Sequence, residues 1–191
     1  MRAVDSVILK TNGNYNNKEV ANGVAYTVNV SIDDVTSINR TATVVAAPYN
    51  SNLNSGDEVI VHHNIMRENI HTSGVKTKGF FNIVDNFYHC PVSEVIMKKN
   101  NEGHWETLLD FVFIKPIKEE NIELGFGMTL APRARKGMKE LRATLAITNK
   151  GLKGVSVGDT VIFSKNSEHE FIIDGEVLFK CEVQDILGKE E

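Results

Sequence analysis

Short hydrophobic runs, many of them β-branched, alternate along the chain with turn-forming residues. The runs that predict strands are Val7–Leu9, Thr41–Ala46, Val59–Val61, Phe111–Ile114, Thr144–Thr148, Thr160–Phe163, Phe171–Ile173 and Val177–Phe179. Between them lie turn signals such as Asn12-Gly13, Gly158-Asp159 and Asp174-Gly175. No stretch of about twelve residues keeps the 3.6-residue period of an amphipathic helix. The pattern therefore predicts an all-β protein, a sandwich or a barrel.

The hydrophobic blocks of the first half recur in the same order in the second half. They pair as Ser6–Lys10 with Asp110–Lys115, Ala42–Ala46 with Ala143–Ile147, Gly56–Val61 with Gly158–Phe163, and Phe87–Ile96 with Leu178–Leu187. The polar segment Lys99–Trp105 interrupts the pattern between the halves. We therefore predict two tandem domains, 1–100 and 106–191, with an insertion in the first near residues 62–86.

Composition narrows the functional class. The chain has 191 residues, 41% of them hydrophobic, and a net charge of −4, which argues against a disordered chain or a general nucleic-acid binder. No apolar stretch is long enough to cross a bilayer, and Met1–Lys10 lacks the hydrophobic core of a signal peptide. A cytoplasmic protein is expected. The two cysteines, Cys90 and Cys181, hold equivalent places in the repeat and are expected to be free, buried thiols.

Candidate catalytic chemistry is sparse. The sequence has no phosphate-binding loop, no dinucleotide fingerprint and no nucleophile–base pattern, so we expect neither an enzyme nor a cofactor. Histidines gather in or near the insertion, at His62, His63, His71 and His89. Neighbours on a strand point to opposite faces, so His62 and His63 are not expected to share a metal. We predict surface or packing histidines and no metal site.

Several motifs of the second half resemble the GroES-type co-chaperonins, the chaperonin-10 family. They are Val112–Pro116 (VFIKP), Val157–Lys165 (VGDTVIFSK), Asp174-Gly175-Glu176 and the ending Asp185-Ile186-Leu187. The first half resembles the family less closely, through Gly56–Val61 and Val92–Ile96. It lacks the Asp-Gly-Glu turn and carries its insertion in that place. The resemblance implies two tandem GroES-like small β-barrels, and the drift of the first is typical of a viral protein.

In that family a mobile, glycine-containing loop after the first strand docks in a hydrophobic groove of a chaperonin. The resemblance places it within Lys118–Arg142, with Gly127, Met128, Thr129 and Leu130 as the docking segment, although Thr129 stands where the family has an apolar residue. In the first half Val24, Ala25 and Tyr26 are a less favoured candidate, because residues 26–32 alternate like an ordinary strand. The implied function is a co-chaperonin that caps a group I chaperonin and assists ATP-dependent folding of a client protein.

The resemblance also implies a homo-oligomeric ring. In the family the first strand of one domain pairs with the last strand of its neighbour, which closes exposed sheet edges. The interface residues would be Val7, Ile8, Leu9, Val112, Phe113, Ile114, Val183, Ile186 and Leu187. The alternative is a viral structural or adaptor protein that keeps the barrels without chaperonin binding. That alternative requires Met128 and Leu130 to belong to the chain's own core.

Overall fold

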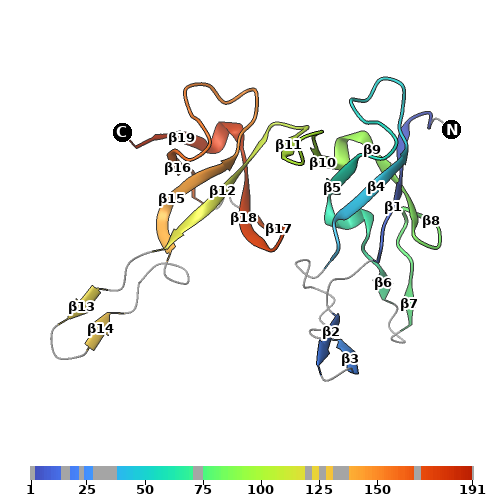
Figure 1. Ribbon diagram of the computed structural model, residues 1–191, viewed down its shortest axis with the longest axis horizontal. Helices are drawn as coiled ribbons and strands as arrows, with labels where there is room; N and C mark the ends of the chain where they lie inside the picture. Colours follow the sequence, from blue (N-terminus) through green and yellow to red (C-terminus); the bar gives the residue numbers. More distant parts are fainter. Residues whose placement is uncertain are drawn as a thin grey trace. The chain divides into compact units, whose positions relative to one another are not determined.

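A computed structural model describes residues 3–13, 18–21, 24–27, 38–70, 75–118, 122–124, 128–130, 138–165 and 169–190. The chain divides into two compact units, unit 1 over Met1–Leu109 and unit 2 over Asp110–Glu191. Each is built around an antiparallel sheet (Figure 1), so the prediction of an all-β protein is confirmed. None of the helices in the described ranges is long and apolar enough to cross a membrane.

Unit 1 contains a seven-stranded sheet in the order β11-β10-β5-β4-β1-β9-β8. Its strands are β1 (Ser6–Lys10), β4 (Thr41–Ala46), β5 (Glu58–Val61), β8 (Asn82–Val84), β9 (Phe87–Pro91), β10 (Val95–Lys99) and β11 (Trp105–Thr107). Two short hairpins lie outside this sheet, β2 (Lys18–Ala21) with β3 (Val24–Thr27) and β6 (Asn69–Ile70) with β7 (Lys76–Thr77). Two 3-10 turns, η2 (His63–Ile65) and η3 (Val92–Glu94), complete the unit as described.

Unit 2 contains a six-stranded sheet in the order β17-β18-β12-β15-β16-β19. Its strands are β12 (Phe111–Lys118), β15 (Met138–Ile147), β16 (Thr160–Phe163), β17 (His169–Ile173), β18 (Glu176–Glu182) and β19 (Ile186–Lys189). One hairpin, β13 (Ile122–Leu124) with β14 (Met128–Leu130), forms a separate two-stranded sheet, and the 3-10 turn η5 (Val183–Asp185) precedes β19.

The two sheets have the same strand order. Reversed, the unit 2 order β19-β16-β15-β12-β18-β17 matches β10-β5-β4-β1-β9-β8 strand for strand. The register agrees as well: directly opposed pairs are Val7–Cys90 and Ala42–Val59 in unit 1, and Val112–Cys181 and Ala143–Val161 in unit 2. The eight predicted strands are all present. The repeated order of hydrophobic blocks along the sequence therefore corresponds to the same strand order in the two sheets.

The Gly-Asp pairs form the same turn in both units. Gly56 and Gly158 have φ near +97° and +96°, a conformation that suits glycine. The carboxylate of the next residue then accepts a backbone N–H three positions upstream, Asp57 from Asn54 and Asp159 from Ser156, both at 2.9 Å. The hydrogen bond from Ser156 holds the pKa of Asp159 below its ordinary value.

The hairpin turn of the second half has a counterpart in the first, which corrects the sequence prediction. Asp174 opens the β17–β18 turn with φ +49°, and Asp85 opens the β8–β9 turn with φ +45°. Aspartate tolerates this left-handed conformation because its short side chain bonds the local backbone. The insertion therefore lies upstream of the turn, where it forms η2, β6 and β7.

The insertion contributes to the core of unit 1. Ile65 and Met66, at the end of η2, are fully buried and belong to the same cluster as Leu9, Val59 and Tyr88. Phe80, further along, is 82% exposed. Phe81, next to it, packs partly against the core.

Within the insertion, Gly79 lies against the backbone carbonyl of Arg67, with no room for a side chain. A Cβ added at Gly79 would lie 2.2 Å from the carbonyl oxygen of Arg67. We expect Gly79→Ala to destabilise unit 1 by about 1–3 kcal/mol, since the backbone has to shift. The measurement is chemical denaturation, with Gly188→Ala as the control, because that site is open. Equal midpoints for the two variants would contradict this packing.

Unit 1 extends past the predicted boundary. β11 pairs with β10 through Lys99–Trp105 and Met97–Thr107, and the Leu108 amide donates to the carbonyl of Ile96 at 2.9 Å. Leu108 also packs against the unit 1 core. The segment that follows residue 100 is therefore the edge strand of unit 1, whereas the sequence pattern assigned it to a linker and to the second domain.

Candidate docking hairpin and open sheet edge

The hairpin β13–β14 lies in the predicted docking loop. Its register pairs Ile122 with Leu130, Leu124 with Met128, and Glu123 with Thr129. The two strands pair only with each other among the strands described, and the six-stranded sheet does not include them (Figure 1). Met128–Leu130 is therefore a strand of a separate hairpin.

The register separates apolar from polar positions. Pairs two residues apart fall on the same face of a β-ribbon. One face thus holds the positions Ile122, Leu124, Met128 and Leu130, and the other holds Glu123 and Thr129. The polar position Thr129 is therefore on the opposite face from Met128 and Leu130. Gly127 lies outside the described residues. Ile122 and Leu124 were missed as candidates, although their alternation around Glu123 was a readable signal.

The corresponding hairpin of unit 1 is not segregated in this way. β2–β3 pairs Ala21 with Val24 and Glu19 with Tyr26 on one face. The other face pairs Val20 with Ala25 and Lys18 with Thr27. Each face mixes charged and apolar positions, so the candidate residues Val24, Ala25 and Tyr26 do not form an apolar stripe. They do form a strand, as far as Thr27; residues 28–32 lie outside the described ranges.

A buried polar network closes the base of the unit 1 loop. Thr11 is 2% exposed, and its hydroxyl donates to the carbonyl of Gly13 at 2.8 Å. From the other end of the loop, the Asn39 amide donates to that carbonyl at 2.8 Å and to the Thr11 hydroxyl at 3.0 Å. The side-chain oxygen Oδ1 of Asn39 accepts a hydrogen bond from the backbone N–H of Thr41 at 3.0 Å. Asn39 therefore ties the two arms of the loop together.

The first-strand residues predicted for the interface lie inside the units. Val7, Leu9, Val112, Phe113 and Ile114 are fully buried, and Ile8 is partly buried. β1 is paired on one edge with β4 and on the other with β9, and β12 likewise with β15 and β18. Within the described sheets these strands have no free edge, and five of the six residues are core residues, so we do not expect β1 or β12 to pair with a neighbouring copy.

The last-strand residues lie where an edge is open. Val183 and Ile186 pack partly against the unit 2 core, and Leu187 is 66% exposed. β19 pairs with β16 and with no other strand in the described sheet. Leu187 corresponds to Ile96 of β10. The carbonyl of Ile96 accepts a hydrogen bond from the N–H of Leu108, which directly follows the edge strand β11. The backbone of Leu187 therefore faces the open edge.

The two adjacent histidines lie closer together than the sequence predicts. η2 begins at His63, so the chain turns there and the two ring centroids are 4.1 Å apart. His62 Nδ1 lies 3.8 Å from a Glu94 carboxylate oxygen. No group of three metal-ligating side chains occurs within the described ranges, which leave out His71. Burial, and then the charges of His62, Arg40 and Arg67, lower the pKa of His63 to about 4.

This pKa predicts a pH dependence for unit 1. As pH falls from about 6.5 to about 4, the unfolded chain takes up a proton at residue 63 before the folded chain does. Stability should therefore decline across this window and be fully present above it. We expect His63→Gln to flatten the decline in denaturation midpoint, and His104→Gln, at an exposed position, to leave it intact. A decline unchanged in His63→Gln would contradict this assignment.

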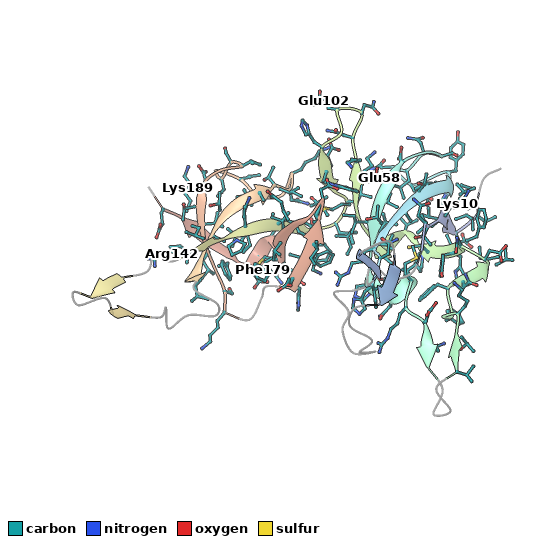
Figure 2. All side chains as sticks on the ribbon, turned by 60° about the horizontal axis from the view of Figure 1, so that its bottom comes forward. Lys10, Glu58, Glu102, Arg142, Phe179 and Lys189 are labelled. Carbon is teal, nitrogen blue, oxygen red and sulfur yellow. The ribbon has the colours of Figure 1, made fainter. Side chains whose placement is uncertain are left out.

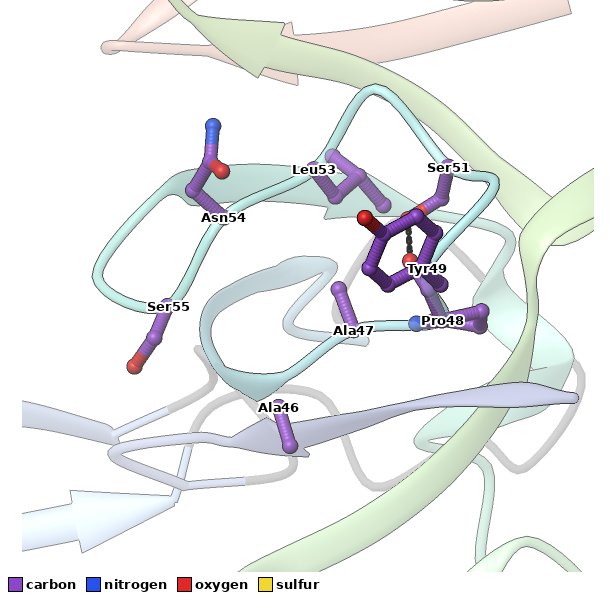
Figure 3. Close-up of a pocket in the computed structure, with 8 residues that line it drawn as sticks. All are labelled: Ala46, Ala47, Pro48, Tyr49, Ser51, Leu53, Asn54 and Ser55. Atoms are coloured by element: carbon purple, nitrogen blue, oxygen red, sulfur yellow. Dashed lines mark hydrogen bonds between the residues drawn. The ribbon is translucent and has the colours of Figure 1, made fainter. Parts of the chain in front are cut away.

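A pocket opens in the loop between β4 and β5 (Figure 3). It has a volume of about 260 Å³ and is lined by Ala46, Ala47, Pro48, Tyr49, Ser51, Leu53, Asn54 and Ser55. Ser51 donates its hydroxyl to the carbonyl of Pro48 at 2.8 Å. No charged side chain lines it, and its volume is below the roughly 300–1,000 Å³ of small-molecule sites. We assign it no chemistry.

The two large sheets and the separate β13–β14 hairpin define the class of the chain as an antiparallel β-protein. No family model matches the chain. The chain is 43% identical over 82 residues to "Co-chaperonin GroES" of Thermotoga neapolitana, a match that spans 42% of this chain and 88% of that protein. The chain belongs to the GroES co-chaperonin family. At the level of the family, this supports a co-chaperonin-like function.

Proposed function

We propose that this protein is a co-chaperonin that docks on a GroEL-type chaperonin ring through the β13–β14 hairpin. Met128 and Leu130 are the anchors, and the register adds Ile122 and Leu124 to the same apolar face. The observation that carries the proposal is the separate hairpin, with one apolar face, in a member of the GroES family. The chaperonin supplies the ATP hydrolysis, and the co-chaperonin closes the folding chamber in the cytoplasm.

The energetics suit a reversible lid. Burial of each anchor side chain contributes about 1.5–3 kcal/mol. The entropy lost on association and on fixing side chains at the contact offsets part of this, so a single hairpin binds weakly. Several hairpins on one assembly recover the affinity because later contacts form at a high effective concentration. Because each contact is weak and the set of contacts is strong, the lid can bind and dissociate in each ATPase cycle of the chaperonin.

We propose that the assembly forms through the open edge of β19. In unit 1 the equivalent strand, β10, is covered by β11, the segment that immediately precedes the first strand of unit 2. A strand of a second copy would cover β19 in the same way. Repeated from copy to copy, this pairing is a head-to-tail arrangement that can close into a ring.

The testing experiment is co-elution with a group I chaperonin on size exclusion, with and without ADP. Nucleotide-dependent co-elution of the full chain is the expected result. If several cognate chaperonins fail to retain the protein, the alternative of a structural or adaptor protein replaces this proposal. That alternative needs Met128–Leu130 as a core strand, and no described pairing favours it.

A further inference from the structure

An irregular stretch interrupts β15 just before it enters the core of unit 2. Pro116 of β12 lies opposite Ala143, but Lys118 lies opposite Met138, so Ile117 alone faces residues 139–142. Leu141 has φ +56°. The other non-glycine residues with positive φ in the described chain, Asp85 and Asp174, are in hairpin turns. A leucine persists in this conformation only where its surroundings impose it.

The surroundings of Leu141 fix it from two sides. Its side chain is partly buried and packs against the unit 2 core cluster, which includes Ala143 and Leu145. The next residue, Arg142 (labelled in Figure 2), pairs with Ile162 of β16. Its guanidinium contacts the carboxylate of Glu190, just after β19. The bulge is therefore bounded by a sheet ladder and anchored in the core.

The position in unit 1 that corresponds to Leu141 has a different backbone conformation and different neighbours. Arg40, two positions before Ala42 as Leu141 is two before Ala143, is not among the described residues with positive φ. Its carbonyl accepts the N–H of Val61, next to the insertion that buries Ile65 and Met66. Unit 2 lacks that insertion, and Leu141 packs at this end of its core instead.

We propose that Leu141 is a positioning residue for the docking hairpin, a role that rests on the proposed function. The left-handed bulge bends β15 so that its first residues run beside Lys118, which sets the register at which both arms of the loop leave the sheet. The packed side chain locks that register. Without the lock, residues 138–141 lose their fixed register beside Lys118 and have to regain it on docking, so affinity falls.

The test compares Leu141→Val, Leu141→Gly and Leu141→Met in the full chain. Valine is branched and resists the left-handed conformation, glycine adopts it but has no side chain to pack, and methionine keeps both properties closest to leucine. Two quantities are measured: cross-strand NOEs between Lys118 and Met138, and affinity for a group I chaperonin ring with ADP. NOEs between Val112 and Cys181 report whether unit 2 remains folded.

We expect Leu141→Met to match the wild type. Leu141→Val and Leu141→Gly should lose the Lys118–Met138 NOEs and bind at least about tenfold more weakly, with the Val112–Cys181 NOEs intact. If valine prevents folding, the glycine variant alone decides. Full affinity in Leu141→Gly, with or without the NOEs, overturns the positioning role. A wild-type chain that binds no chaperonin overturns the proposed function first, whereas binding by the wild type with unchanged variants overturns only this inference.

Discussion

Replacing Met128 and Leu130 together by serine is expected to abolish co-elution with the chaperonin. The two side chains contribute about 3–6 kcal/mol together if both are buried on docking, which corresponds to at least about a hundredfold in the affinity of one hairpin. Because an assembly binds through several hairpins, the loss multiplies across them. The measurement is size exclusion of the chaperonin with ADP and the variant, followed by titration calorimetry.

The hairpin supplies its own control. The double variant Glu123→Ser with Thr129→Ser places one serine on each strand of the hairpin. The two positions are directly opposed and lie on the other face. This variant should keep most of the binding, since the apolar face is untouched. If both double variants bind as the wild type does, the docking segment lies elsewhere in the chain. If both lose binding equally, the face assigned by the register is wrong.

Leu187→Pro is expected to convert the assembly to single chains. Proline has no N–H, so it removes a donor from the edge that β19 leaves open. The ladder to β16 should survive, because it runs through the neighbouring positions Ile186 and Gly188. Ile186 is already extended, with φ −81° and ψ 108°, which is the conformation that a following proline requires. Light scattering coupled to size exclusion measures the mass.

Leu187→Ala is the matched control for that substitution. It shortens the exposed side chain but keeps the backbone N–H, so we expect the assembly to persist with at most modest weakening. Amide protection at Val161 and Phe163 reports whether the β16–β19 ladder is intact in each variant. A full-sized assembly in Leu187→Pro would contradict the proposed strand addition and would place the contact between copies on another surface.

Eight strands of the two sheets were readable from sequence because each is a short hydrophobic run, many of them β-branched, with turn residues nearby. The Gly158-Asp159 turn is an example, since its φ and its carboxylate bond each select the residue found there. The equivalence of the two cysteines followed from the repeat, and the structure places them opposite Val7 and Val112. Burial holds Cys90 as a thiol, with its pKa raised to about 12.

The remaining features depend on pairing that local sequence does not encode. Trp105–Thr107 forms a strand because it pairs with the edge of β10 and because Leu108, which follows it, packs against the core. The residues Trp105–Thr107 alone carry no strand pattern. Sequence alone did not place β1 and β12 inside their sheets, because a hydrophobic strand looks alike at the centre and at the edge of a sheet. For the hairpin, only the register showed that Thr129 and the anchors occupy different faces.

The late position of β11 has a consequence for synthesis of the protein. On the ribosome, β10 emerges before the strand that covers it, so unit 1 has an exposed edge until residues 105–108 follow. Translation that slows near residue 100 would prolong that exposure, and exposed edges recruit other nascent chains. The rate at which the ribosome translates codons 100–104, between β10 and β11, would therefore affect the yield of folded protein independently of the side chains they encode.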